Sequence, residues 1–278
     1  NGLVGNGGVT NDRTLDLRGT AEAGSVVYIT NPANGGVYGS VTAGADGKWS
    51  YPLTTNYNQT YNFQAYSIDK AGNRSVNSTN FAITIDTVNN APVISGAYDN
   101  VAGGIYNGLV GNGGLTNDRT PELRGTAEAG SVVYIINPAN GGVYGSVTAG
   151  TNGAWSFSVT TNYNQLYNFQ AYSIDKAGNR SVNSSNFGIT IDGTNAAPVI
   201  TSVMDGVGTV TGNVANAGST DDNTPTLNGT AEAGSTVYIA VNGSSYSVTA
   251  AANGNWSFTP PALPLGNHTF SVFSIDKA

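Results

Sequence analysis

Residues 117–136 read NDRTPELRGTAEAGSVVYII, two runs of alternating side chains separated by a short polar and glycine segment. Polar and apolar side chains alternate through residues 122–127 and again through 131–137, which is the pattern of strands with one buried face. The segment AEAG between them ends in Gly130, a residue that favours tight turns. β-Branched and aromatic residues, which favour strands over helices, fill the second run. The stretch therefore predicts two neighbouring β-strands joined by a turn.

The same stretch occurs three times in the 278 residues. NGLVGNGG at Asn1 returns at Asn107, an offset of 106 residues; the first two copies are near-duplicates, whereas the third has diverged. All three copies share GTAEAG, a Trp and SIDKA, found at Gly19, Gly125 and Gly229, at Trp49, Trp155 and Trp256, and at Ser67, Ser173 and Ser274. A period of roughly 100 residues is too long for a solenoid repeat and suits a self-contained domain.

The domain boundaries follow from two similar segments. IDTVNNAPVI (85–94) and IDGTNAAPVI (191–200) each read as a closing strand, a short linker and a Pro that opens the next domain. They predict three domains: 1–88 without its first strand, 89–194 complete, and 195–278 without its last strand. The two missing strands leave exposed sheet edges. Either the sequence is cut there, or the edges invite strand donation between neighbouring molecules.

The complete domain is expected to be a two-sheet β-sandwich. Alternation and turn signals predict seven strands and no helix, at 92–98, 122–127, 131–137, 143–149, 154–160, 167–174 and 183–191. A long connection rich in Gly and Asn joins the first two strands. The single Trp of each copy is expected in the core, with stacking on carbohydrate as the alternative.

Composition argues against several other classes of protein. Only 10% of the residues are charged and Gly accounts for 38, which favours the all-β interpretation. The chain has no Cys, so disulfides do not stabilise it. A net charge of −7 argues against binding nucleic acid or anionic membranes. No apolar run is long enough for membrane insertion, and the first residues form no signal peptide. We therefore expect an internal piece of a larger protein, or an export signal elsewhere.

Three motifs carry a resemblance to a known family. TNDRTPELRGTAEAGSVVYI, an Asn-Gly turn before Trp-Ser, and YSIDKAGNRS resemble the bacterial Ig-like repeats of giant Gram-negative adhesins and biofilm-associated proteins, which type 1 secretion exports. The resemblance covers essentially the whole chain. It implies tandem seven-stranded immunoglobulin-like β-sandwiches, arranged as an extracellular rod on the bacterial cell surface. It also implies a spacer in cell adhesion or biofilm formation, with Ca²⁺ at acidic domain junctions. Its partners would be neighbouring repeats, and host or bacterial surface ligands reached through other domains.

The acidic residues recur between copies, and the diverged third copy keeps every position that it covers. In a seven-stranded sandwich, the turn with Glu128 and the hairpin with Asp175 lie where the chain enters, and the preceding domain delivers Asp86 there. Calcium prefers six to eight oxygen ligands. The sequence therefore predicts Ca²⁺ at two junctions, one formed by Asp86, Glu128 and Asp175 and the other by Asp192, Glu232 and Asp276.

A second kind of ion site is predicted at the long first connection. Acidic pairs flank this Gly-rich loop, namely Asp99 with Asp118 and Asp205 with Asp222. Asp in such loops also serves turn chemistry alone. At the junction, the alternative to an ion is a solvated pair of Asp175 with Lys176 or Arg180, which contributes about 0–1 kcal/mol.

Catalysis is not expected, because the single His, His268, occurs in the third copy alone. The glycine-rich NGLVGNGG lacks the Lys-Ser/Thr and the helix of a phosphate-binding loop. The alternative to a spacer is a glycan- or protein-binding module that contacts the receptor directly, with stacking surfaces at Tyr57, Tyr61, Tyr163 and Tyr167. Copying favours the spacer, because binding sites tend to lie in one specialised domain. We therefore predict a spacer whose linkers hinge without ions and stiffen with Ca²⁺.

Overall fold

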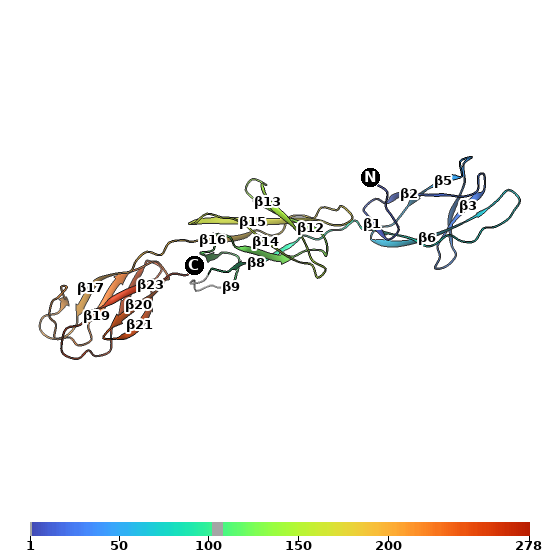
Figure 1. Cartoon of the computed structure of the whole chain (residues 1–278). Coiled ribbons are helices and arrows are strands. Elements are labelled where there is room, and N and C mark those ends of the chain that lie inside the picture. Colours follow the sequence, from blue (N-terminus) through green and yellow to red (C-terminus); the bar gives the residue numbers. More distant parts are fainter. Residues whose placement is uncertain (1, 102–107) are drawn as a thin grey trace. The chain divides into compact units, whose positions relative to one another are not determined.

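The chain is described by a computed structural model, for residues 2–101 and 108–278. Every regular element in this part of the chain is a β-strand, so the predicted all-β class is confirmed (Figure 1). Within the same residues, no helix is available to cross a membrane.

The residues group into two compact units. The first comprises Asn1–Ile94, Gly125–Trp155 and Gln170–Ser185, and the second comprises Ser95–Arg124, Ser156–Phe169 and Asn186–Ala278. The second copy is divided between the two units. Each of the two linker segments, by contrast, lies within a single unit, as do the side chains that surround it.

The second copy is a β-sandwich of two sheets, with the strand orders β10-β16-β15-β12-β13 and β14-β11-β8-β9. Its strands are β8 Val93–Asp99, β9 Gly108–Val110, β10 Gly114–Thr116, β11 Glu122–Thr126, β12 Val132–Ile136, β13 Val143–Thr148, β14 Ala154–Ser158, β15 Gln165–Ile174 and β16 Phe187–Ile191. The seven predicted strands are all present, within a few residues. Alternation located them because the apolar positions, such as Leu123, Val133 and Ile135, are fully buried.

Two further strands lie in the connection that was expected to have none. In β9, Val110 pairs antiparallel with Ala97 of β8, and in β10, Gly114 pairs parallel with Ile189 of β16. The Gly- and Asn-rich sequence gives no alternation signal, because these short strands are held by backbone pairing rather than by a row of apolar side chains. The seven-strand prediction was therefore incomplete for this copy.

The first and third copies repeat the two-sheet arrangement with fewer strands. In the first, the sheets are β1-β7-β6-β3-β4 and β2-β5. Its strands are β1 Gly8–Thr10, β2 Thr14–Thr20, β3 Val26–Thr30, β4 Val37–Thr42, β5 Lys48–Thr54, β6 Gln59–Ile68 and β7 Phe81–Ile85. In the third, the sheets are β18-β17-β19-β22 and β21-β20-β23. Its strands are β17 Val199–Asp205, β18 Gly212–Asn213, β19 Thr226–Thr230, β20 Thr236–Val241, β21 Ser244–Thr249, β22 Asn255–Phe258 and β23 Ser271–Ile275.

The repeated Trp belongs to the core, as predicted. Trp155 and Trp256 are each 4% exposed, so neither offers its ring to a carbohydrate. The Gly of GTAEAG makes room for the indole, because a Cβ at Gly125 would lie 2.5 Å from Cζ2 of Trp155. Trp49 packs against the core of the first copy in the same way.

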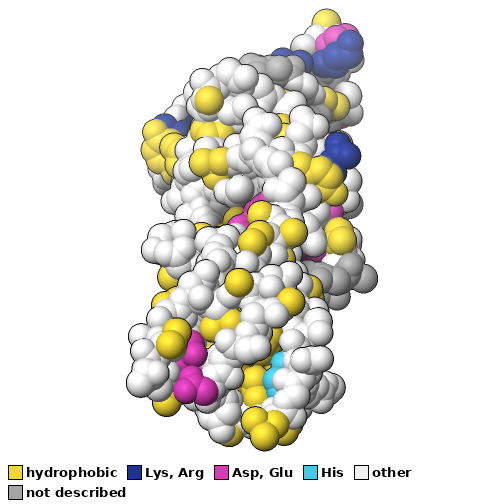
Figure 2. Space-filling view, turned by 90° about the vertical axis from the view of Figure 1, so that its left-hand side faces the viewer, with side chains coloured by type: hydrophobic (Ala, Val, Ile, Leu, Met, Phe, Trp, Pro, Cys, Tyr) yellow, Lys and Arg dark blue, Asp and Glu magenta, His cyan; other side chains and the backbone are white. Residues whose placement is uncertain are grey.

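The surface is mostly uncharged. On the face shown in Figure 2, acidic and basic side chains are scattered among polar ones, as expected from a chain with 10% charged residues. Three ion pairs are found among the described residues, namely Arg18–Asp16, Lys48–Asp46 and Arg124–Glu122. The predicted junction carboxylates are in none of them.

Candidate cation sites at the linkers

The first candidate site gathers Asp86, Glu128 and Asp175. Asp86 follows β7, Glu128 lies in the turn between β11 and β12, and Asp175 follows β15. Their ligand oxygens all lie within 4.8 Å of one another. The Glu128 turn is fixed by Ser131, whose backbone N–H and hydroxyl both donate to the Glu128 carbonyl oxygen at 3.0 and 2.8 Å. The fold thus brings together the three carboxylates that the sequence predicted for this junction.

Asn179 connects two members of this set. Its backbone N–H donates to Asp175 Oδ1, and its Nδ2 donates both to Asp175 Oδ2 and to the Asp86 carbonyl oxygen, at distances of 2.8 to 2.9 Å. Asp86 Oδ1 accepts the backbone N–H of Val88 at 3.1 Å. These bonds hold Asp86 and Asp175 in place but bring no positive charge to either carboxylate.

The electrostatics of the first site are repulsive. Partial desolvation, followed by the charges of Asp86 and Asp175, raises the pKa of Glu128, while Lys176 opposes the shift. The alternative of a Lys176 or Arg180 ion pair with Asp175 does not form in the described structure. The Arg180 guanidinium instead lies over the Tyr172 ring, 3.8 Å from its centroid.

The second candidate site has the same composition at the next linker. Asp192, Glu232 and Asp276 also place their ligand oxygens within 4.8 Å of one another. Here Glu232 Oε2 accepts the backbone N–H of the linker residue Ala196 at 3.2 Å. The arrangement recurs although the third copy has diverged in sequence, so it depends on the fold rather than on near-identity of the copies.

The donor set fits a hard divalent cation. Each site offers three carboxylates and no nitrogen or sulfur ligand among the described residues. Calcium takes six to eight oxygens in flexible geometry, whereas transition metals are selected by imidazole or thiolate. Since nearby carboxylates disfavour one another's ionised form, a bound cation would relieve the repulsion that raises the pKa of Glu128.

The two loop pairs differ from each other. Asp99 and Asp118 are 0% and 1% exposed, and Thr116 connects them by donating its hydroxyl to Asp99 Oδ2 and accepting the Asp118 N–H. Asp118 Oδ2 is buried without a hydrogen-bond partner. In the third copy, the equivalent Oδ2 of Asp222 accepts the Gly206 N–H at 2.9 Å. Neither pair acquires a third acidic residue among the described residues.

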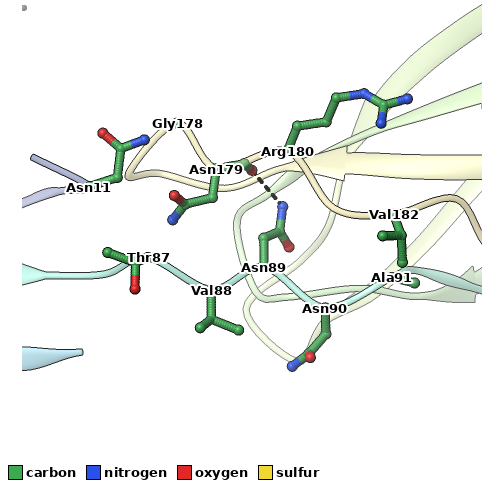
Figure 3. A pocket seen from close by; sticks show the side chains of 10 residues that line it. All are labelled: Asn11, Thr87, Val88, Asn89, Asn90, Ala91, Gly178, Asn179, Arg180 and Val182. Atoms are coloured by element: carbon green, nitrogen blue, oxygen red, sulfur yellow. Dashed lines mark hydrogen bonds between the residues drawn. The ribbon is translucent and has the colours of Figure 1, made fainter. Parts of the chain in front are cut away.

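The linker itself supplies residues whose hydrogen-bond partners the sequence did not predict. A polar groove is lined by Asn11, residues 87–91, residues 178–180 and Val182 (Figure 3). Inside it, Asn89 donates its Nδ2 to the Asn179 carbonyl oxygen at 2.8 Å, the bond drawn in Figure 3. Asn side chains give no distinctive signal in a chain so rich in Asn. The recurrence of Asn in both linkers was the one sequence signal that pointed to them.

The four Tyr residues considered for direct glycan binding make contacts within their own copies. Arg13 lies 3.7 Å from the centroid of the Tyr57 ring, and Arg119 lies 5.1 Å from that of Tyr163. The hydroxyls of Tyr61 and Tyr167 accept backbone N–H groups at 2.7 and 2.8 Å. Tyr57 and Tyr163 nevertheless remain 60% and 48% exposed, so direct glycan binding stays a prediction.

His268 has a local role as well. Its Nδ1 lies 3.0 Å from Asn242 Oδ1, and its Nε2 lies 2.8 Å from the Pro264 carbonyl oxygen. Nδ1 therefore connects the segment before β23 to the turn between β20 and β21, and Nε2 is bonded within that segment. This arrangement agrees with the surface role expected from its occurrence in one copy.

Solved structures of adhesins are similar to the chain. A Ca²⁺-stabilised adhesin with which an Antarctic bacterium binds ice is 20% identical, with 95% of this chain and 68% of that chain covered and a TM-score of 0.32. A fragment of a 1.5-MDa bacterial ice-binding adhesin is 19% identical, with 95% and 90% covered and a TM-score of 0.34. A tetra-tandem repeat from the extending region of a large adhesion protein is 19% identical, with 97% and 73% covered and a TM-score of 0.30.

The sequence pattern of one domain family accounts for nearly the whole chain. No curated protein matches the chain significantly. The pattern of the bacterial Ig-like domain, however, matches three successive segments, residues 1–87, 103–193 and 197–278. The chain therefore belongs to the bacterial Ig-like domain family, of which it contains three tandem repeats.

Proposed function

We propose that the chain is a set of spacer repeats from a bacterial cell-surface adhesin, and that Ca²⁺ stiffens it at the linkers. One observation carries the proposal: at both linkers, three carboxylates lie within 4.8 Å of one another, and none of them forms an ion pair among the described residues. Such an arrangement destabilises the folded chain unless a cation is bound. The role is structural and needs no catalytic group.

The positions of the carboxylates explain how one cation would stiffen the chain. Asp86 precedes the linker, whereas Glu128 and Asp175 follow it. A cation bound to all three ties the segment before the linker to two turns after it. Asp192, Glu232 and Asp276 would act in the same way at the second linker. Resistance to bending then depends on the Ca²⁺ concentration outside the cell.

The remaining parts of the proposal concern the whole protein. We propose that 1–88, 89–194 and 195–278 are its successive domains and that they form a rod. The rod is exported by type 1 secretion and lies outside the cell. Other domains of the same protein contact host or bacterial ligands during adhesion or biofilm formation. The low share of charged residues, 10%, and the absence of Cys suit a polar spacer that needs no oxidation to fold.

We also propose an ion at the loop of the second repeat. Burial of two carboxylates is unfavourable when no cation pairs with them, and none does among the described residues. Within the same residues, Asp118 Oδ2 has no hydrogen bond to compensate its burial. A cation between Asp99 and Asp118 would satisfy that oxygen. In the third repeat, the Gly206 N–H already satisfies Asp222, so the need for an ion between Asp205 and Asp222 is smaller.

Thermal unfolding with excess EDTA and with millimolar Ca²⁺ tests the function. Extracellular modules bind Ca²⁺ with a Kd of roughly 10⁻⁴–10⁻³ M, and a tenfold excess over Kd adds about 1.4 kcal/mol per site. We expect melting to shift upward with Ca²⁺ and part of the shift to vanish in Asp175→Asn. The matched control is Asp69→Asn, which changes the equivalent residue of the first repeat outside either acidic cluster. Melting curves that do not change when Ca²⁺ is added would contradict the proposal.

A further inference from the structure

The linkers are bonded more completely than their Asn-rich sequence suggests. We infer that two side-chain clamps, one on each side, fix every linker before any cation binds. The inference deepens the proposed function, because the clamps set the positions from which the carboxylates reach the cation. It rests on that function for its purpose, but the hydrogen bonds that carry it involve no ion.

The first clamp connects the linker to the repeat that precedes it. Asn58 Oδ1 accepts both the backbone N–H and the hydroxyl of Thr87, at 2.9 and 3.0 Å. At the second linker, Asn164 Oδ1 accepts the Gly193 N–H at 3.1 Å. Asn58 and Asn164 have φ angles of 51° and 57°, in the left-handed region that Asn tolerates better than most residues.

The middle of the linker is bonded to one of the candidate ligands. The Val88 N–H donates to Asp86 Oδ1 at 3.1 Å. The second linker has the same bond, from the Thr194 N–H to Asp192 Oδ1 at 3.1 Å. Each bond aligns the carboxylate with the linker backbone. It leaves the other carboxylate oxygen for a cation.

The second clamp connects the linker to the repeat that follows. Asn89 Nδ2 donates to the Asn179 carbonyl oxygen at 2.8 Å (Figure 3). It also donates to the Ser173 carbonyl oxygen at 3.0 Å, and the Ser173 hydroxyl donates back to Asn89 Oδ1 at 3.1 Å. Asn195 and Ser274 form the same reciprocal pair at the second linker, at 2.8 and 3.1 Å. Ser173 and Ser274 are the first residues of the SIDKA motif.

The clamps hold the first three residues of the linker. At the first linker, Thr87, Val88 and Asn89 are three consecutive residues, each held by a side chain. On this inference the linker does not hinge freely even without ions. Hinging requires the loss of at least one clamp, and the cation acts on a linker whose course is already set.

The test measures the spread of linker geometry in EDTA. The chain has no Cys, so Ser40→Cys and Ser146→Cys place two unique spin labels at exposed positions of the matched strands β4 and β13. We expect a narrow distance distribution in EDTA, broadened at least about twofold by Asn89→Ala. Asn90→Ala changes the neighbouring exposed Asn, which has no side-chain bond in the described structure, and should leave the width unchanged.

A second variant keeps the inference testable if Asn89→Ala misfolds. Asn58→Gly removes the acceptor of the first clamp but suits the left-handed backbone. In EDTA it should speed hydrogen exchange at the Thr87 amide about fivefold, the factor that corresponds to about 1 kcal/mol for one hydrogen bond. The tryptophan fluorescence of each variant verifies that the repeats are folded.

The outcomes separate the clamps from the cation. A distribution that is narrow only when Ca²⁺ is present, and equally broad in EDTA with and without Asn89→Ala, would overturn the inference while leaving the proposed function standing. A narrow distribution that depends on Asn89 but ignores Ca²⁺ would support the clamps and contradict the calcium part of the proposed function.

Discussion

Glu128→Gln removes one negative charge from the first cluster and nearly preserves the shape of the side chain. Two unit charges 4.8 Å apart, the outer limit for this cluster, repel each other by about 0.9 kcal/mol in water. Glu128 faces two such charges, from Asp86 and Asp175. Salt at 0.15 M, with a Debye length of about 8 Å, reduces the sum to about 1 kcal/mol. In EDTA the substitution should therefore stabilise the first linker region by about that amount.

Calorimetry measures this effect. A gain of about 1 kcal/mol raises the Tm of a domain of about 100 residues by roughly 4–8 °C. The same variant loses a cation ligand, so the rise in Tm on adding Ca²⁺ should shrink. Opposite responses in EDTA and in Ca²⁺ distinguish charge repulsion at a cation site from a general packing effect.

The first repeat supplies the control. Glu22 occupies the same turn, and its carbonyl oxygen accepts the Ser25 N–H at 3.0 Å, as the Glu128 carbonyl oxygen does from Ser131. Among the described residues, Glu22 belongs to neither acidic cluster. Glu22→Gln should leave both melting curves unchanged. The reasoning is refuted if Glu128→Gln fails to stabilise the chain in EDTA, or if Glu22→Gln has the same effect.

Three further predictions follow from the same geometry. Because the pKa of Glu128 is raised above its usual 4.5, its stabilising contribution is present below pH 4.5 and lost as the pH rises through the raised value. Melting in EDTA should show this loss of stability. In Ca²⁺ the loss should disappear. Gly125→Ala should cost about 1–3 kcal/mol or more, because the new Cβ meets the Val93 carbonyl oxygen and Trp155. Gly111→Ala, with open space around it, should be nearly neutral in urea unfolding. Asp118→Asn should lower the number of Ca²⁺ ions bound in equilibrium dialysis, and an unchanged number would exclude the loop site.

The fold was largely predictable because burial follows the sequence pattern. Leu123, Val133 and Ile135 alternate with less buried residues and are fully buried, so their strands were found from the alternation of side chains alone. β9 and β10 were missed, because Gly and Asn carry no such pattern. Their pairing with β8 and β16 depends on backbone groups that become neighbours only in the folded sandwich.

The candidate sites were predictable in part, for a related reason. Loops at one end of a sandwich converge, so the strand order was enough to group Asp86, Glu128 and Asp175. The hydrogen-bond partners of single side chains, by contrast, could not be predicted from the strand order. Nothing in the sequence distinguishes Asn89, which is bonded to the next repeat, from Asn90 beside it. The difference between Asp118 and Asp222 likewise depends on one backbone N–H, whose direction only the folded loop determines.

Direct measurement of Ca²⁺ binding tests the central claim. Isothermal titration of the intact chain, after removal of metals with EDTA, should show saturable binding with a Kd of roughly 10⁻⁴–10⁻³ M. Asp175→Asn should weaken or abolish one junction site and Asp276→Asn the other, whereas Asp69→Asn should leave the titration unchanged. A chain that binds no Ca²⁺ in this range, or binds it equally well in all three variants, would contradict the account.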